Sequence, residues 1–93
     1  MIRSFKHKAL EKFFRSVRGQ GIRQEHIKRL RLILGALNEI TDLRDIGFYP
    51  GLNLHPLKGN YKGFWAVSVS GNWRVIFRCE GEDVFDVDYL DYH

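Results

Sequence analysis

The amino-acid sequence predicts an α+β domain in which two helices come first and a small antiparallel sheet follows. Apolar residues recur at helical spacing up to residue 37, the period changes to two from residue 64, and the stretch between them is irregular, with glycines and prolines. Helices followed by a run of strands are typical of α+β folds. Because 93 residues suffice for one core and not for two, we expect residues 1–93 to form a single domain.

The first helix is predicted after a short strand-like segment, residues 2–5, which we expect to join the sheet. Its apolar residues recur at the i, i+3, i+4, i+7 spacing of one helical face and are Leu10, Phe13, Phe14 and Val17. Lys8, Lys12 and Arg15 fall on the opposite side, so the helix is amphipathic with a basic face.

A second amphipathic helix is predicted after the two glycines of "RGQGIR". Its apolar face is formed by Ile27, Leu30, Leu34 and Leu37. We expect the two helices to form a hairpin. Gly35 lies inside the second helix, where glycine costs ~1 kcal/mol relative to alanine, and we expect it to mark a close approach to a neighbouring segment.

The sheet is predicted to begin with "LNLH", a short strand stopped by Pro56, because proline cannot donate to a strand ladder. The loop "PLKGNYKG" follows. Residues 64–69 and 73–78 then alternate in polarity around the turn "SGN", and "VFDVDYL" follows a second turn. These three strands predict an antiparallel meander, with Phe85, Val87 and Tyr89 on one face of the last strand and Asp86 and Asp88 on the other.

Composition and cysteine content favour a cytosolic globular protein. The chain is 44% hydrophobic and 14% aromatic, and no apolar run approaches the roughly 20 residues that span a bilayer. The N-terminal residues lack the continuous apolar stretch of a secretory signal. Cys79 is the single cysteine, which suits a reducing compartment, and the acids of "RCEGED" are expected to raise the pKa of its thiol, so we do not expect a nucleophile there.

The charge is divided between the two halves of the chain. Residues 1–44 carry eleven Lys and Arg against four Asp and Glu, a balance of +7, whereas residues 45–93 carry four against seven, a balance of −3; together they give the net +4. A basic half points toward a polyanionic partner such as nucleic acid, although a basic helical face is also often plain solvated surface.

The histidines do not predict a metal site. His7, His26, His55 and His93 are widely separated, no HxxxH pair occurs and no second cysteine is present, so zinc is not expected. The chain also lacks a glycine-rich phosphate loop of the P-loop or dinucleotide type. We therefore expect no metal and no small-molecule cofactor.

Arg74 lies in the middle strand of the predicted meander and points away from the face of Trp73, Val75 and Phe77. One interpretation is a cross-strand ion pair with Asp86 or Asp88. The other is a guanidinium that is held on a rigid strand and whose planar donors suit a phosphate.

His55, taken alone, is more typical of a surface or capping histidine than of a catalyst. Together with Lys58, Arg74 and the final "DYH", however, it supplies the groups needed to cleave RNA. The 2′-hydroxyl must lose a proton, the charged phosphorane must be stabilised and the departing 5′-oxygen must gain a proton. Side chains alone can perform these steps.

At these residues the chain resembles the HigB-type toxins of bacterial toxin-antitoxin modules, within the RelE/ParE superfamily. The matching segments are "MIRSFKHK", "LHPLKG", "GFWAVSVSGNWRVIF" and the final "DYH", and they extend over essentially the whole chain. The resemblance implies a RelE-like microbial RNase fold, with two helices packed on one face of a small, mostly antiparallel sheet and the active site on the other face.

The resemblance also implies an activity and partners. Such a toxin is a metal-independent, ribosome-dependent messenger-RNA endonuclease that cuts codons in the ribosomal A site, halts translation in the bacterial cytoplasm and is neutralised by a HigA-type helix-turn-helix antitoxin. Carried over by matching position, its catalytic residues would be His55, Asp91, Tyr92 and His93, with Lys58 and Arg74 near the scissile phosphate.

Roles for these residues follow as expectations. His55 and His93 are the candidate proton-transfer pair, and a carboxylate at the end of the chain would favour protonated His93 as the acid, although the assignment stays open. Asp91 would orient His93 or act as the base itself, and Tyr92 would stack on a base or hydrogen-bond the phosphate. Since strict alternation would turn Tyr92 away from the other two, we expect the strand to twist or break at its last residues.

The basic helical faces are expected to hold ribosomal RNA without sequence preference and with strong salt dependence. The residues concerned are Lys8, Lys12, Arg15, Arg23, Lys28, Arg29 and Arg31. Two other functions remain open: a ParE-like toxin that shares the fold but inhibits DNA gyrase, and a non-catalytic RNA-binding domain. A gyrase inhibitor needs no catalytic residues, so His55 and the final "DYH" argue against it.

Overall fold

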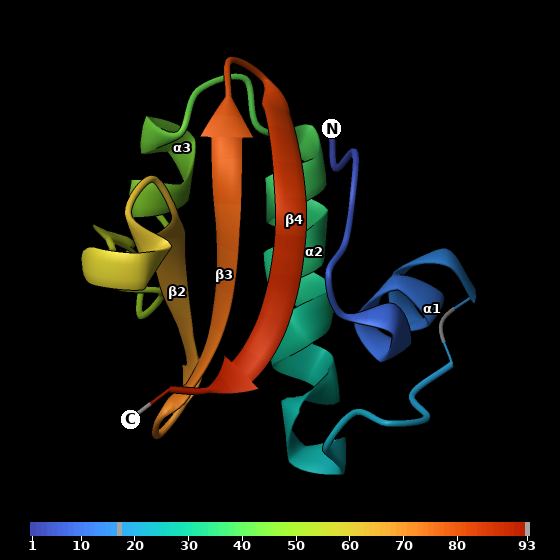
Figure 1. The fold of residues 1–93 in the computed structure, drawn as a ribbon. Helices are drawn as coiled ribbons and strands as arrows, with labels where there is room; N and C mark the ends of the chain where they lie inside the picture. The colour runs from blue at the N-terminus through green and yellow to red at the C-terminus, as the bar shows by residue number, and fades with distance from the viewer. Residues whose placement is uncertain (17, 93) are drawn as a thin grey trace.

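The computed structural model describes residues 1–16 and 18–92, which form an α+β fold with helices on one side of an antiparallel sheet (Figure 1). The elements in chain order are α1 (Lys8–Ser16), η1 (Gln24–His26), α2 (Ile27–Glu39), α3 (Arg44–Gly47), β1 (His55–Pro56), η2 (Gly59–Tyr61), β2 (Trp65–Ser70), β3 (Trp73–Glu80) and β4 (Asp83–Asp91). The predicted class, both long helices and the three-strand meander are confirmed. In the described ranges, none of the helices is long and apolar enough to cross a membrane.

The helices bury the faces that their periodicity predicted. Leu10 and Phe13 of α1 are buried, while Val17 lies outside the described residues. His7 caps the start of α1, because its Nδ1 accepts a hydrogen bond of 3.0 Å from the backbone N–H of Leu10. The buried face of α2 consists of Leu30, Ile33, Leu34, Ala36 and Leu37.

The close approach expected at Gly35 is found instead at Gly21, between the helices. A Cβ at Gly35 would meet nothing within 4 Å, so that expectation was wrong. Gly21 has φ +80°, and a Cβ there would lie 2.8 Å from the Cβ of Ala9 in α1. Only glycine suits both this backbone conformation and this proximity, so Gly21 lets the connection from α1 to η1 pass close to α1.

The sheet has the order β1-β2-β3-β4 within the described residues, with every neighbouring pair antiparallel. The N-terminal segment lies beside β4 and runs parallel to it, through isolated bridges from Ile2 to Val84 and from Phe5 to Val87. Figure 1 shows this segment between β4 and α1. The expected addition of residues 2–5 to the sheet is thus seen as two bridges rather than a full strand.

The first strand is shorter and later than "LNLH". β1 comprises only His55 and Pro56, which pair with Ala66 and Trp65. Asn53 has φ +50°, and this left-handed conformation interrupts the extended backbone before His55. Pro56 is tolerated because, among the described residues, β1 is the edge strand and its outer side pairs with no other strand that needs a donor.

A β-bulge in β4 changes which residues share a face. From Ile76 to Arg78 in β3 the pairing moves two residues, but in β4 it moves three, from Asp88 to Phe85, and Asp86 there has φ +56°. The extra residue separates Phe85 from Val87. The prediction that Phe85 shares a face with Val87 was therefore wrong, and Val84 takes that place in the main core.

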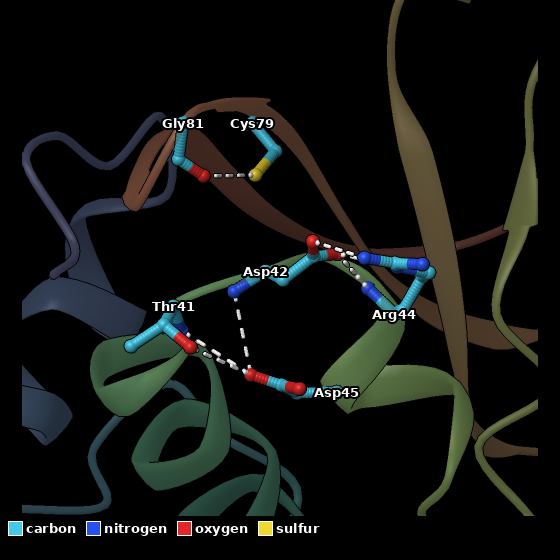
Figure 2. A network of polar contacts seen from close by, with 6 residues as sticks. All are labelled: Thr41, Asp42, Arg44, Asp45, Cys79 and Gly81. Carbon is cyan, nitrogen blue, oxygen red and sulfur yellow. Dashed lines mark hydrogen bonds and ion pairs between the residues drawn. The ribbon is translucent and has the colours of Figure 1, made fainter.

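A polar corner fixes α3 directly after α2 (Figure 2). One carboxylate oxygen of Asp45 accepts hydrogen bonds from the Thr41 hydroxyl at 3.2 Å and from the Asp42 amide at 3.3 Å. The guanidinium of Arg44 donates to both carboxylate oxygens of Asp42, at 3.2 and 3.0 Å. These hydrogen bonds hold the pKa of the Asp42 carboxyl below its ordinary value. The corner places Ile46, which is 1% exposed, in the core.

The two faces of the sheet carry different cores. The main core joins the helices to the inner face of the sheet and includes Leu30, Val75 and Phe77. A smaller cluster lies on the opposite face, where Leu57, Ala66 and Ile76 are buried. We call this second face, opposite α1, α2 and α3, the open sheet face.

Candidate functional site

The open sheet face is partly covered by the loop between β1 and β2. Buried Leu57 anchors this loop, and its N–H donates to the carbonyl of Phe64 at 2.9 Å. Partly buried residues that pack around the buried cluster are Tyr61, Phe64, Leu90 and Tyr92. They come from the loop and from the end of β4, so the loop and the last residues of the chain meet on this face.

His55 lies on the open sheet face at its β1 edge. It pairs directly with Ala66 of the open-face cluster, and directly opposed residues in an antiparallel pair share a face. The side chain is exposed, and Nδ1 lies 2.8 Å from the carbonyl oxygen of Asn53. Because a carbonyl only accepts, Nδ1 carries the proton, and in the neutral ring Nε2 is then the basic nitrogen.

Arg74 lies on the same face as His55, two strands away. It pairs with Ser68 in β2 and with Leu90 in β4, and Leu90 packs in the open-face cluster. Neighbouring strands are ~4.8 Å apart, so β1 and β3 are separated by about 10 Å. One guanidinium nitrogen, Nη1, donates to the carbonyls of Gly71 at 2.7 Å and Trp73 at 3.0 Å. These bonds hold the guanidinium at the turn between β2 and β3.

Among the described residues, Arg74 forms an ion pair with neither Asp86 nor Asp88. Another arginine takes the Asp86 carboxylate, and the Asp88 carboxylate accepts a hydrogen bond of 2.9 Å from the N–H of Tyr89. Nε of Arg78 lies 2.8 Å from Asp86, and its Nη1 lies 3.5 Å from Glu80. The hydrogen bond that Arg78 donates to Asp86, together with the negative charges of Asp86 and Glu80, raises the pKa of Arg78. The bulge at Asp86 explains the choice, since it moves this residue along β4 to face Arg78.

Lys58 is exposed and lies immediately before η2, one residue after buried Leu57. The loop anchor therefore keeps its backbone beside the open sheet face. Lys6 also reaches this face and was not predicted. Its Nζ lies 5.8 Å from the centroid of the Phe64 ring, whereas its neighbour Phe5 packs against the main core. The turn of the N-terminal segment beside β4 carries the ammonium there, and the sequence offered no periodic pattern to show it.

The last residues of β4 face opposite sides of the sheet. Tyr92 lies on the open sheet face, where its ring is 6.2 Å from that of Tyr61. Its N–H donates to the carbonyl of Asn72 at 2.7 Å, so the pairing continues past the end of β4. Asp91 pairs with Trp73 and lies on the helix side. The expected twist or break is thus not seen up to Tyr92, and His93 lies outside the described residues.

The predicted basic residues of the helices lie away from the open sheet face, and four of them make specific contacts. Arg15 pairs with Glu11 at 3.2 Å, and Arg23 pairs with Glu25 at 2.7 Å. Nη2 of Arg29 donates to the carbonyl of Gly51 at 2.6 Å, which ties α2 to the segment before β1. The Arg31 guanidinium lies 5.7 Å from the centroid of the Phe13 ring. Exposed on the same helices are Lys8, Lys12 and Lys28.

The structure brings no metal-binding cluster together in residues 1–16 and 18–92: no group of three or more His, Cys, Asp or Glu side chains is placed to hold an ion. The pKa of the Cys79 thiol is raised, as predicted, but burial is the first cause and the charge of Asp42 the second, whereas Asp83 of "RCEGED" contributes less. Its Sγ donates to the carbonyl of Gly81 at 3.5 Å, as Figure 2 shows. Cys79 is thus a weak candidate for a nucleophile.

A protein-family model and a related protein that match this chain both point to the same family. The family model of HigB-like toxins, described as the RelE-like toxin HigB of type II toxin-antitoxin systems, matches residues 3–93. Endoribonuclease HigB of Proteus vulgaris is 35% identical over 95 residues, a match that covers 100% of both chains.

Solved structures share the fold at low sequence identity. The YoeB-YefM toxin-antitoxin complex of Staphylococcus aureus includes a chain that matches with a TM-score of 0.63 at 15% identity, over 100% of this chain and 98% of that one. YafQ of E. coli strain BL21(DE3) matches with a TM-score of 0.57 at 16% identity, over 98% and 91%. The predicted fold is therefore confirmed.

Proposed function

Since the chain belongs to the HigB-like family of RelE-like toxins from type II toxin-antitoxin systems, we propose that it is an endoribonuclease that cleaves messenger RNA in the ribosomal A site. The observation that carries this proposal is the convergence of His55, Arg74 and Tyr92 on the one sheet face that lies opposite α1, α2 and α3. They come from β1, β3 and the end of β4 respectively, with Lys58 and Lys6 beside them. Such a face can receive an extended RNA strand.

The reaction begins with the 2′-hydroxyl of the nucleotide before the scissile phosphate. Nε2 of His55 removes its proton, because Nδ1–H is engaged with the carbonyl of Asn53 and leaves Nε2 as the basic atom. The 2′-oxygen attacks phosphorus, the bond from phosphorus to the 5′-oxygen breaks, and His93 donates a proton to that oxygen. The products are a 2′,3′-cyclic phosphate and a free 5′-hydroxyl.

Cations of the open sheet face stabilise the charge that develops on the phosphorane. Arg74 supplies planar donors from a strand, and Lys58 and Lys6 supply ammonium groups. Tyr92 stacks on a base next to the scissile phosphate, an interaction worth ~1–3 kcal/mol per base. Asp91, on the other side of β4, orients His93 rather than removing the proton itself. Each step is assigned to a side chain, so the proposal includes no metal or organic cofactor.

The partners follow from the same family. We propose that the chain acts in the bacterial cytoplasm, that ribosomes present the messenger RNA, and that a HigA-type helix-turn-helix antitoxin neutralises it. The exposed cations of α1 and α2, among them Lys8, Lys12 and Lys28, would contact ribosomal RNA through its phosphates. Binding would then weaken steeply with increasing salt, whatever the RNA sequence.

The test is to incubate the purified protein with ribosomes translating a defined messenger and to map the new RNA ends. We expect cleavage within the A-site codon by the wild type and none by His55→Ala or His93→Ala. Growth arrest that survives both substitutions and is accompanied by gyrase-linked DNA breaks would contradict the proposal. Ribosome binding by the wild type without any cleavage would contradict it as well.

A further inference from the structure

A cluster of aromatic rings lies behind the end of β4, on the helix side of the sheet. His26 is 2% exposed, and its Nδ1 lies 2.6 Å from the hydroxyl oxygen of Tyr89. The Trp73 ring stacks on Tyr89 with centroids 4.7 Å apart, and the His26 ring meets Trp73 edge-on at 5.5 Å. We call His26, Trp73 and Tyr89 the terminal brace.

The terminal brace is connected directly to the last residues of the chain. Tyr89 precedes Asp91 by two residues on the same side of β4, and Trp73 is the pairing partner of Asp91. Asn72, next to Trp73, accepts the hydrogen bond of 2.7 Å from the Tyr92 N–H. The rings therefore lie directly beside the backbone where β4 ends and Tyr92 follows.

The hydrogen bond within the terminal brace is more than packing requires. Burying an imidazole and a phenol costs free energy unless each finds a partner, and an apolar pair of similar volume would fill the same space without that cost. A directional bond fixes the torsion of the Tyr89 ring, which dispersion contacts alone leave less constrained. The Arg23 guanidinium lies 5.6 Å from the Trp73 ring centroid. This cation–π contact also helps to hold the Trp73 ring.

We infer that His26 and Tyr89 are positioning residues for the proposed cleavage: their hydrogen bond fixes the end of β4 and so holds Tyr92 on the open sheet face, where His55 lies. This inference rests on the proposed function. His26 and Tyr89 face the main core, so neither would touch the RNA. Their effect passes through the backbone of β4, and small displacements of reacting groups are costly, since a shift of about 1 Å can cost ~10²-fold in rate.

Tyr89→Phe is the sharpest variant, because it removes one hydroxyl and keeps the ring that stacks on Trp73. His26→Leu removes the other partner. His26→Asn restores a polar atom near the position of Nδ1 and is the rescue variant. Tyr49→Phe, on a tyrosine that is 38% exposed in the segment before β1, removes a hydroxyl away from the brace and is the matched control.

Two measurements test the inference, one of them independent of cleavage. The first is amide hydrogen exchange at the Tyr92 N–H in the protein alone. Tyr89→Phe and His26→Leu should speed this exchange ~5-fold, the equivalent of one lost hydrogen bond at ~1 kcal/mol, while Tyr49→Phe should leave it unchanged. The second is single-turnover cleavage on programmed ribosomes, with the rate at saturation and the half-saturating ribosome concentration determined separately.

We expect Tyr89→Phe and His26→Leu to lower the saturated rate by ~10–10²-fold with the half-saturating concentration unchanged, and His26→Asn to recover most of the loss. Wild-type exchange and wild-type rates in both loss variants would overturn the inference. So would a loss of rate without faster Tyr92 exchange. If the wild type itself does not cleave, the proposed function fails, whereas the exchange measurement still decides whether the brace fixes Tyr92.

Discussion

Replacement of His55 tests whether this residue is the general base. The contact between His55 and the Asn53 carbonyl suggests a matched control variant. Nδ1 of His55 faces the carbonyl of Asn53 at 2.8 Å, so the atom available for proton transfer is Nε2. His55→Asn places an amide nitrogen near the position of Nδ1 and can still donate to that carbonyl, but it has no atom in place of Nε2. His55→Ala loses both functions.

If His55 is the general base, both variants should lose ~10²–10⁴-fold in the single-turnover cleavage rate. This factor corresponds to ~3–5 kcal/mol of activation free energy at 1.36 kcal/mol per tenfold change. Stability should hardly change, because the side chain is exposed and its one bond to Asn53 is worth only ~1 kcal/mol. The thermal midpoint should therefore stay within a few degrees of the wild type.

The assay is cleavage of an A-site codon on programmed ribosomes, with saturating toxin and a thermal melt of each variant. A His55→Asn rate close to that of the wild type, with His55→Ala inactive, would refute the reasoning. It would show that His55 holds the segment before β2 through the Asn53 carbonyl and does not transfer a proton. A fall in rate that follows the thermal midpoint would refute it in the same way.

Three further predictions concern other parts of the fold. Lys6→Gln should lower the cleavage rate ~10-fold, because one charge-assisted contact to the phosphate is lost. Lys12→Gln on α1 should change only the salt dependence of ribosome binding. Equal effects of the two substitutions on the rate would contradict a role for Lys6 at the scissile phosphate. Phe77→Ala should lower the free energy of unfolding in urea by ~3–5 kcal/mol, because Phe77 is 0% exposed. Phe85→Ala should lower it by less than half of that, because the bulge turns Phe85 out of the main core. Similar losses for the two variants would argue against the bulge. Because its pKa is raised, the Cys79 thiol should alkylate more slowly near pH 7 in the folded protein than in urea. The rate of alkylation should increase as the pH rises toward and above 9.0, the ordinary pKa of the thiol. Equal rates in the two states at pH 7 would contradict the raised pKa.

Most of the architecture could be predicted from the sequence because its helices and strands bury one face each. Leu30, Leu34 and Leu37 repeat at helical spacing, and Val75 and Phe77 alternate along β3, so burial and period agree. The departures occur where the backbone leaves a regular conformation. Asn53 and Asp86 both adopt positive φ without being glycine, and nothing in their local sequence demands it.

The candidate site was predictable in its residue types and less so in its geometry. His55 and Arg74 belong to short matching segments, and the structure places both on the open sheet face. Asp91 faces the helices instead, because the ladder of β4 continues regularly to the hydrogen bond of Tyr92. The position of Lys6 could not be predicted, because it depends on the parallel pairing of the N-terminal segment with β4. These residues lie far apart in the chain, and the local pattern of apolar residues does not indicate such a pairing.

The central claim is that side chains on the open sheet face cleave RNA by attack of its own 2′-hydroxyl. The most direct measurement uses ribosomes programmed with two messengers that differ only in a 2′-O-methyl group on the nucleotide before the scissile phosphate. We predict cleavage of the unmodified messenger to a 2′,3′-cyclic phosphate and a 5′-hydroxyl, with no cleavage of the methylated one. Equal cleavage of both messengers would contradict the account, because the 2′-oxygen could then not be the nucleophile that His55 activates.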